Sequence, residues 1–220
     1  MKKEGVYDFI FAGAGAATLQ ILGQLLEDEK LATASILILE KKENKANDRT
    51  WCFWEEKEKS NWTPMVAKSW NSINFSSSNV QLHEPIAPMA YKMVRSGAYY
   101  NSMRKAIAQH SNIDLRFESV ENYQENSRYV TVFTSKNSYK GTYFFNSIFD
   151  WSILKNQTKY PVLQQHFVGW FIKTQDDFFD PNTATFMDFG VAQKGNTRFM
   201  YVLPLCKNEA LVEYTLFSKD

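Results

Sequence analysis

The hydrophobic pattern of the first forty residues predicts a strand, a helix and a second strand. Residues 9–12 form a short apolar run that ends in a turn with two glycines. Leucines then recur at the spacing of one helix face up to residue 26. Residues 36–39 form a continuous apolar run, typical of a parallel strand buried on both faces, and the run ends at Glu40. Strand, glycine turn, helix, strand and acid follow each other as in a dinucleotide-binding βαβ unit.

The residues of the glycine turn each suit a bound dinucleotide. Gly13 permits the tight turn, and Gly15 leaves room for the backbone to approach a pyrophosphate. Ala16 is small and stands where the helix begins, and the free N–H groups of a helix N-terminus attract phosphates. Glu40 is placed to accept hydrogen bonds from ribose hydroxyls, which favours FAD or NAD over NADP. Thr18 replaces the third glycine of the usual motif, and a glycine turn in an unrelated α/β protein is the alternative.

After residue 70 the pattern changes to apolar strands interrupted by one helix. Strands are predicted at residues 73–77, 80–82, 91–94, 113–117, 129–133, 139–145, 147–149, 168–172, 184–189, 198–205 and 209–217. Ser96 is predicted to cap a helix that runs to about residue 110. The strand at 147–149 ends in Asp150, a candidate for the cofactor side, with an ordinary strand-end turn as the alternative. The late strands suit an antiparallel sheet that walls an apolar tunnel.

Composition and charge exclude several classes of function. The chain has 220 residues and a net charge of +1, so no basic field indicates nucleic-acid binding. Aromatic residues make up 15% of the chain, which suits a bulky apolar ligand or simply an aromatic core. Three widely spaced histidines predict no metal site.

The cysteines and the N-terminus bear on the compartment. Cys52 and Cys206 form no CxxC pair, and two cysteines are too few for a disulfide framework, which favours a reducing compartment. The N-terminus imitates a signal peptide or a membrane span. Glu4 and Asp8 interrupt the approach to its apolar run, so neither is expected.

Residues 47–55, NDRTWCFWE, crowd aromatic side chains beside charges without a helix or strand period. Because Glu40 ends the second strand, residues 41–54 are expected to cross the cofactor side of the sheet. Arg49 would then reach the pyrophosphate through charge-assisted hydrogen bonds. Trp51 and Trp54 would lie near the reactive ring of the cofactor. The alternative is that these aromatic side chains plug the space under a long loop.

Five stretches in order along nearly the whole chain resemble the bacterial lycopene β-cyclase family. They are DRTWCFWE, YKMVRSGAYYNSM, QQHFVGWFIKT, FDPNTATFMDF and RFMYVLPLCKNEALVEYTLFS. Two departures are visible. Tyr214 stands where the family often has a second acid after the glutamate of LVE-x-T. Family members are also longer and close the flavin site with a later glycine-rich segment, so this chain is expected to be truncated at its C-terminus.

The resemblance implies an α/β fold with a Rossmann-like FAD/NAD(P)-binding domain and an antiparallel substrate-domain sheet. Residues 1–72 and 94–155 would form the FAD-binding domain, and residues 73–93 and 156–220 the substrate-binding domain. The implied ligands are reduced FAD, with NADPH as electron source, and the carotenoid lycopene. Because such a substrate lives in the bilayer, we expect a cytoplasmic protein in peripheral contact with the inner face of the cell membrane.

The implied reaction is an acid-initiated ring closure without net oxidation or reduction. The family carries its essential glutamate at the position of Glu213, and desolvation on an apolar strand should raise the pKa of that residue. A glutamate that points to solvent is the alternative. Trp51, Trp54 and Trp170 are candidates to bind substrate and stabilise the cation, at roughly 0.5–2 kcal/mol each. A reduced, anionic flavin contributes more, on the order of 4 kcal/mol at an effective dielectric near 20.

Two other functions stay open at this point. A flavin-dependent monooxygenase or reductase acting on an isoprenoid would use the same fold. A non-catalytic dinucleotide-binding fragment would follow from the missing closing segment. Asp48 and Asp188 are weaker candidates for the acid.

Overall fold

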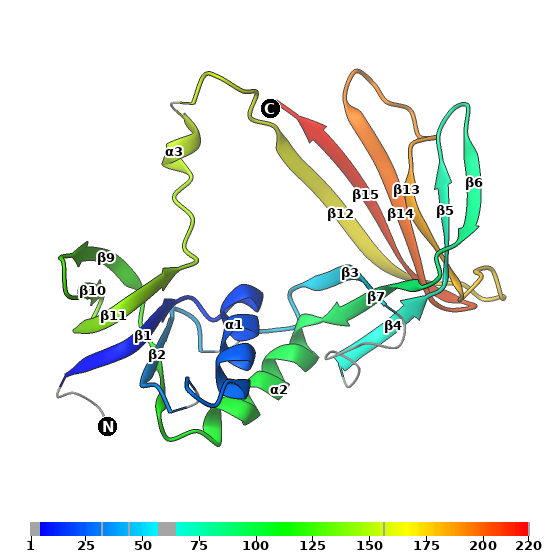
Figure 1. Ribbon diagram of the computed structural model, residues 1–220. Coiled ribbons are helices and arrows are strands. Elements are labelled where there is room, and N and C mark those ends of the chain that lie inside the picture. The colour runs from blue at the N-terminus through cyan, green and yellow to red at the C-terminus, as the bar shows by residue number, and fades with distance from the viewer. Residues whose placement is uncertain (1–4, 32, 44, 57–64, 156, 220) are drawn as a thin grey trace. The chain divides into compact units, whose positions relative to one another are not determined.

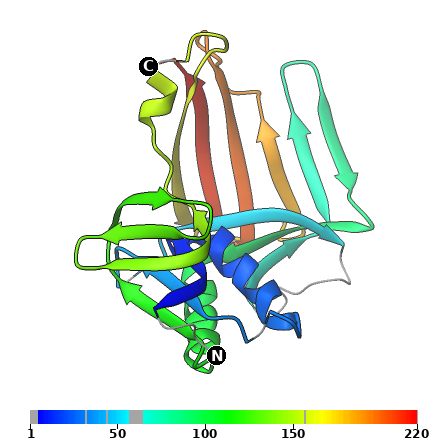
Figure 2. The same ribbon diagram turned by 60° about the vertical axis from the view of Figure 1, so that its left-hand side comes forward.

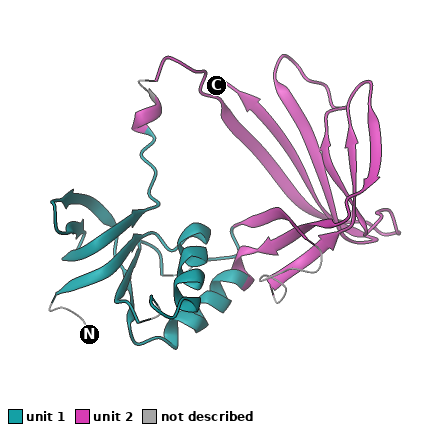
Figure 3. Ribbon diagram, viewed as in Figure 1, with its two compact units in different colours: residues 1–48, 99–151 teal, residues 49–98, 152–220 magenta. Residues whose placement is uncertain are grey.

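The computed structural model describes residues 5–31, 33–43, 45–56, 65–155 and 157–219. The chain forms two compact units, coloured separately in Figure 3. Unit 1 comprises residues 1–48 and 99–151, and unit 2 comprises residues 49–98 and 152–220.

Unit 1 is built on a sheet whose strands run in the order β8, β2, β1, β11, β10 and β9 (Figure 1). Their bounds are Ile113–Phe117, Ile36–Glu40, Val6–Ala12, Ser138–Asn146, Val130–Thr134 and Val120–Glu125. The strands β8, β2, β1 and β11 are parallel, and β10 and β9 continue the sheet in antiparallel pairing. All residues of β2 are buried, as a central parallel strand requires.

Helix α1 (Ala16–Glu27) connects β1 to β2, so the predicted strand, glycine turn, helix and strand are present. Thr18, at the position of the third motif glycine, is 2% exposed and packs closely inside the unit. Helix α2 (Ser96–Ala108) begins in unit 2 and continues in unit 1. None of the helices in the described part of the chain has the length and hydrophobicity needed to cross a membrane.

Unit 2 contains a broad sheet with the strand order β12, β15, β14, β13, β5 and β6, which Figures 1 and 2 show from two directions. The bounds are Gln164–Lys173, Glu209–Ser218, Thr197–Cys206, Thr183–Asp188, Ser72–Ser76 and Gln81–Pro85. Neighbouring strands are antiparallel except β13 and β5, which are parallel. The short helix α3 (Ser152–Lys155) precedes this sheet.

A smaller sheet of unit 2 has the order β3 (Thr50–Glu56), β7 (Met89–Arg95) and β4 (Val66–Trp70). Residues from both sheets form a common core that includes Trp70, Met93, Leu203 and Leu211. The indole N–H of Trp70 donates to the carbonyl of Pro204 at 2.9 Å inside this core. One face of the broad sheet is therefore partly covered by the smaller sheet.

The structure departs from the sequence prediction at several elements. The aromatic stretch shows no alternation of polar and apolar residues, so no strand was predicted there. Residues 50–56 nevertheless form β3, because each of them pairs with a residue of β7. The predicted strand at 147–149 is wrong: β11 ends at Asn146, and the chain leaves the sheet there. Strands β4 and β9 were not predicted.

The compact units also begin and end at other residues than the predicted domains. Since β3 and β4 both pair with β7, residues 49–72 and 94–98 belong with unit 2. The two units are defined by contacts within the chain, and these contacts do not identify the residues that bind a ligand. The division into an FAD-binding and a substrate-binding part therefore stays a prediction.

Candidate functional site

The glycine turn of unit 1 follows β1 at the edge where the parallel strands end. Gly13 has a φ of 93°, and its N–H donates to the carbonyl of Leu39 at 2.7 Å. A Cβ at Gly13 would lie 2.7 Å from Ser147 Oγ, which itself donates to the carbonyl of Ala12 at 2.5 Å. Both the backbone conformation and the lack of space thus require glycine here.

Gly15 differs from Gly13, because neither its φ of -83° nor a protein contact requires glycine there. It precedes α1, and no side chain caps the N-terminus of that helix. A Cβ at Gly15 would have no other atom within 4 Å, so the space beside this residue is not occupied by another part of the protein. Ala16 is the first residue of the helix. The first N–H groups of a helix have no partner inside the helix, and the pyrophosphate of a dinucleotide is the kind of group that such a turn can bind.

Glu40 holds the turn in place from the end of β2. Its Oε2 accepts hydrogen bonds from the Ala14 N–H at 2.9 Å and from Lys45 Nζ at 2.6 Å, and its Oε1 accepts from the Lys42 N–H at 3.1 Å. Burial acts to raise the pKa of Glu40, but the hydrogen bonds from Lys45, Ala14 and Lys42 outweigh it and lower the pKa below its usual value. A carboxylate has about four acceptor sites, and these three donors use three of those of Glu40.

Lys45 was missed by sequence reasoning because it lies in a stretch without period. Its ammonium also donates to the carbonyl of Ala14 at 2.7 Å and lies 5.0 Å from the centre of the Tyr100 ring. Asp150 lies in unit 1, three residues after Ser147, in the segment that leaves the sheet. Because no strand precedes it, the argument that placed Asp150 at a strand end fails, and its cofactor role stays a prediction.

Arg49 belongs to unit 2, where its backbone forms two hydrogen bonds with Ser96. Its N–H donates to Ser96 Oγ at 3.0 Å, and its carbonyl accepts from the Ser96 N–H at 2.9 Å. The guanidinium is on an exposed residue. Its approach to a pyrophosphate stays a prediction.

Glu213 lies in the middle of β15, half-buried, between two neighbouring strands. In the register of the sheet it is opposite Gly169 of β12 and Tyr201 of β14. A Cβ at Gly169 would lie 3.4 Å from Glu213 Oε2, so the carboxyl group lies against β12. Burial raises the pKa of Glu213, and a hydrogen bond from Thr215 Oγ1 at 3.3 Å lowers it only in part. The carboxyl group therefore keeps its proton to a higher pH than an exposed glutamate.

An aromatic cluster, consisting of Trp54, Tyr91, Phe186 and Tyr201, adjoins Glu213. Ring centroids are 4.9 Å apart for Trp54 and Tyr91, 5.4 Å for Trp54 and Phe186, and 5.8 Å for Phe186 and Tyr201. Burial raises the pKa of Tyr91 and of Tyr201, and the charge of Glu213 adds to both shifts. Both hydroxyls therefore stay protonated beside the carboxyl group.

Cys52 lies beside this cluster. Its side chain is hydrogen-bonded to Tyr91, and burial raises the pKa of the thiol to about 11, with Glu213 adding to the rise. Because side chains alternate along a strand, Trp51 points to the opposite face of β3 from Cys52 and Trp54. Of the two tryptophans predicted in this stretch, Trp54 is the one that the structure brings to the aromatic cluster.

The aromatic surface continues across the broad sheet from Tyr201. Centroids are 5.3 Å apart for Tyr201 and Phe199, 5.2 Å for Phe199 and Phe189, and 5.7 Å for Phe189 and Phe75. The sequence predicts an apolar wall from these late strands. Glu213 places a carboxyl group beside that wall.

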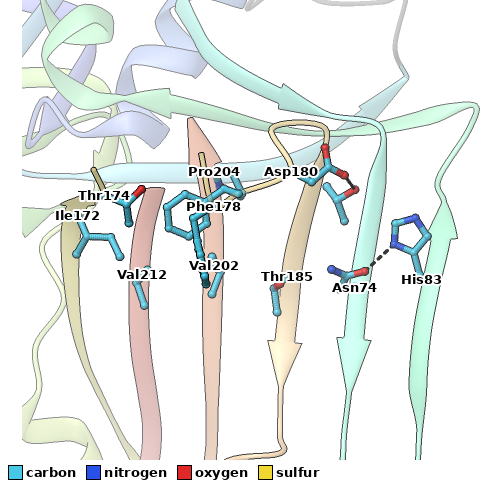
Figure 4. A pocket seen from close by; sticks show the side chains of 12 residues that line it. Asn74, His83, Ile172, Thr174, Phe178, Asp180, Thr185, Val202, Pro204 and Val212 are labelled. Atoms are coloured by element: carbon cyan, nitrogen blue, oxygen red, sulfur yellow. Dashed lines mark hydrogen bonds between the residues drawn. The ribbon is translucent and has the colours of Figure 1, made fainter. Parts of the chain in front are cut away.

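Trp170 does not join this site. It pairs with Val212, so its side chain lies on the other face of the broad sheet from Glu213. That face carries a cavity of about 650 Å³, shown in Figure 4, whose wall includes Val202 and Val212. His83 Nδ1 and Asn74 Oδ1 are hydrogen-bonded at 2.7 Å at one end of it. A substrate role for Trp170 next to Glu213 is therefore not supported, because β12 alternates its side chains.

Gly169 and Tyr201 are among the residues of this site that the sequence analysis did not single out as functional. Both occur in the quoted family stretches, but their importance depends on the strand register. The sequence does not give that register, which the structure shows for Glu213 with Gly169 of β12 and Tyr201 of β14. Both residues were therefore visible in the sequence, but the strand pairing that places them opposite Glu213 was not predicted.

Solved structures of flavoenzymes share this fold at low sequence identity. A geranylgeranyl bacteriochlorophyll reductase-like protein from Thermoplasma acidophilum aligns with a TM-score of 0.63 and 11% identity, over 98% of this chain and 57% of that one. The p-nitrophenol 4-monooxygenase PnpA from Pseudomonas putida DLL-E4 gives 0.60 and 12%, over 97% and 58%. The halogenase PltM in complex with phloroglucinol and FAD gives 0.63 and 12%, over 96% and 51%.

These likenesses show that the chain shares the fold of these proteins, one of which was solved with FAD, and it spans a little over half their length. The family is shown by the sequence. The model of the lycopene cyclase protein family matches residues 8–220, and the chain belongs to that family. No curated protein sequence matches it.

Proposed function

We propose that unit 1 binds FAD through a Rossmann-like βαβ element. Supporting observations are the parallel order of β8, β2, β1 and β11, and the glycine turn at the carboxyl ends of these strands. Gly13, Gly15 and Ala16 would hold the pyrophosphate, and Glu40 the ribose. The FAD seen with halogenase PltM on a similar fold favours FAD among the dinucleotides.

The protein is a lycopene β-cyclase, and Glu213 is its acid/base residue. The observation that carries this proposal is a carboxyl group with a raised pKa beside a wall of aromatic side chains. A hydrocarbon offers no polar group to bind, so an apolar wall selects it. Protonation of an alkene needs a positioned carboxylic acid, and burial raises the pKa of Glu213 in the direction that favours its protonated form.

The chain's own residues account for the steps as follows. Glu213 gives its proton to a terminal double bond, which leaves a positive charge on the adjacent tertiary carbon. A neighbouring alkene attacks that carbon and closes the ring. The carboxylate formed at Glu213 then accepts the proton lost from the ring, so no atoms or electrons are gained overall.

Two groups would stabilise the cation between these steps. The rings of Trp54 and Tyr201 offer their negative faces, at roughly 0.5–2 kcal/mol each. Reduced FAD, when bound, supplies negative charge for the same purpose, with NADPH as the source of its electrons. The apolar substrate partitions into the lipid bilayer, so the protein would bind peripherally to the inner face of the cell membrane.

Incubation with lycopene and reduced FAD tests the proposal. We expect a product of unchanged mass with a shifted absorption band. A gain of one oxygen atom would instead indicate a monooxygenase, as for the neighbour PnpA, and a gain of two hydrogen atoms a reductase. Flavin fluorescence of the purified protein is a separate check, since absence of bound flavin favours a fragment that does not bind the cofactor.

A further inference from the structure

Strand β12 forms one edge of the broad sheet (Figure 1). It pairs with β15 along all ten of its residues, and no other strand in the described part of the chain pairs with it. About half of these residues direct their N–H and C=O groups away from β15, because the backbone groups of a strand alternate between its two sides. Such a row of backbone donors and acceptors is a template for one more strand.

The sequence of β12 lacks the features that usually protect an edge strand from pairing. Proteins protect such strands with charged residues, with proline or by keeping them short. The opposite edge of the same sheet, β6, has only five residues and contains Glu84 and Pro85. The edge strands of the other two sheets, β8, β9, β3 and β4, each carry at least one charged residue. In β12 the only lysine, arginine or acid is Lys173, at the last position.

The centre of β12 exposes large apolar side chains on both faces of the sheet. Phe167 and Phe171, on the face of Glu213, are 60% and 44% exposed. Val168 and Trp170, on the other face, are 59% and 70% exposed. A strand added at this edge would remove apolar surface from water on both faces, in addition to pairing the backbone groups.

The order of these side chains makes β12 complementary to a second copy of itself. When two copies run antiparallel with Gly169 opposite Gly169, Phe167 of each copy lies opposite Phe171 of the other, and Val168 lies opposite Trp170. Residues directly opposite each other share a face, so both faces gain aromatic or apolar pairs of the kind that stabilises sheets. A shift by two residues in either direction would instead place one of the phenylalanines opposite Gly169.

We propose that two copies of this chain associate through antiparallel pairing of their β12 strands, with Gly169 at the twofold axis. The pairing uses the β12 edge of both copies, and the β6 edges that remain are protected, so the assembly closes at two copies. Since Glu213 pairs with Gly169, the face that carries this carboxyl group continues from one copy into the other. The inference does not depend on the proposed function.

Sedimentation equilibrium of this chain tests the association. We expect a mass of twice the 25.6 kDa of one chain, which falls to that of one chain on dilution. Val168→Lys places a charge at an exposed position of the pairing strand and should raise the Kd of the dimer roughly 10-fold or more. Leu82→Lys, at an exposed position of β6, is the matched control and should sediment like the parent protein. A parent protein that is a single chain at every concentration, or equal effects of the two substitutions, would overturn the proposal.

A mixture of two cysteine variants tests the register without weakening the charge balance of the strand. Phe167→Cys and Phe171→Cys are each prepared with Cys206→Ser, since Cys206 is an exposed thiol, and circular dichroism checks that both fold. Opposite residues have Cα atoms about 4.5–5.5 Å apart, within the range of a disulfide. Like positions in the two copies are instead offset by four residues, about 13 Å along the strand. Under oxidation, peptide mass spectrometry should find a disulfide between the introduced cysteines in the mixture but not in either variant alone. No such disulfide in the mixture, or one formed within a single variant, would overturn the proposal.

Discussion

At the scale of single residues, Glu213 shows how strand register sets the chemistry of a carboxyl group. Its neighbours across the sheet are a glycine, against which its carboxyl group lies, and a tyrosine, which offers a ring. Desolvation in this setting raises the pKa, as the apolar flanks in the sequence predict. The identity of those two neighbours could not be predicted, because register depends on turns and pairings far along the chain.

The raised pKa predicts a pH dependence of stability that Glu213→Gln should remove. A carboxyl group whose pKa is higher in the folded than in the unfolded state binds more protons when folded. Stability is then lost as pH rises from the unfolded value near 4.3 through the folded pKa. Urea unfolding should show a smaller loss over this window for Glu213→Gln than for the parent protein.

The control for that experiment lies on the same strand. Glu209 is also half-buried on β15, four residues earlier, and pairs with Lys173. Glu209→Gln removes a carboxyl group from the same strand and serves as the comparison for Glu213→Gln. An equal effect of the two substitutions would contradict the raised pKa of Glu213.

Tyr201 provides a separate prediction about its ring and its hydroxyl. If the ring stabilises a cation, Tyr201→Phe should keep most of the activity, and Tyr201→Leu should lose roughly 2- to 30-fold in kcat, which corresponds to about 0.5–2 kcal/mol. Steady-state kinetics on lycopene would measure both. Equal activity of the leucine and phenylalanine variants would remove Tyr201 from the mechanism.

At the scale of elements, helix α1 offers a test substitution and its control: Gly15 precedes the helix, and Gly23 lies inside it. A Cβ meets no atom within 4 Å at Gly15 or at Gly23. Gly15→Ala should fold normally but lose flavin, because the methyl group occupies the space reserved for the pyrophosphate. Gly23→Ala should retain flavin and gain up to about 1 kcal/mol of stability from helix propensity. Flavin absorbance and thermal melting distinguish them, and full flavin content in Gly15→Ala would contradict the assignment of the turn.

Glu40 stabilises the same turn and gives the opposite dependence on pH. Its lowered pKa means that its contribution to stability is present above the unfolded value near 4.3 and is lost as pH falls through the folded pKa. Glu40→Gln keeps the shape of the side chain but removes the negative charge that pairs with Lys45. We expect the variant to be less stable than the parent at pH 7 and nearer to it at pH 3, as measured by urea unfolding. A constant difference between pH 3 and pH 7 would contradict the charge-based account.

The elements also show what the sequence could and could not predict. The βαβ order and the late strands follow from apolar periods and were found, because burial imposes those periods directly. Strand β3 was missed, since both of its faces carry aromatic side chains and hide the alternation. The strand at 147–149 was predicted from three apolar residues, but the Ser147 side chain bonds to Ala12 and ends the sheet there.

At the scale of the whole molecule, the two units carry different parts of the proposed chemistry. The glycine turn of unit 1 has the features of a dinucleotide site, and unit 2 carries the proposed acid and the aromatic cluster. The fold of each was largely predictable, but which face of the broad sheet holds the acid was not. The position of Trp170 on the opposite face is the clearest example.

The central claim is that Glu213 delivers a solvent-exchangeable proton to an alkene carbon. Cyclisation of lycopene in D₂O, by the parent protein and by Glu213→Gln, measures this by mass spectrometry of the product. The account predicts one deuterium per ring from the parent and a loss of about 10²- to 10⁴-fold in rate for the variant. Ringed product without deuterium, or formed by the variant at the parent rate, would contradict it.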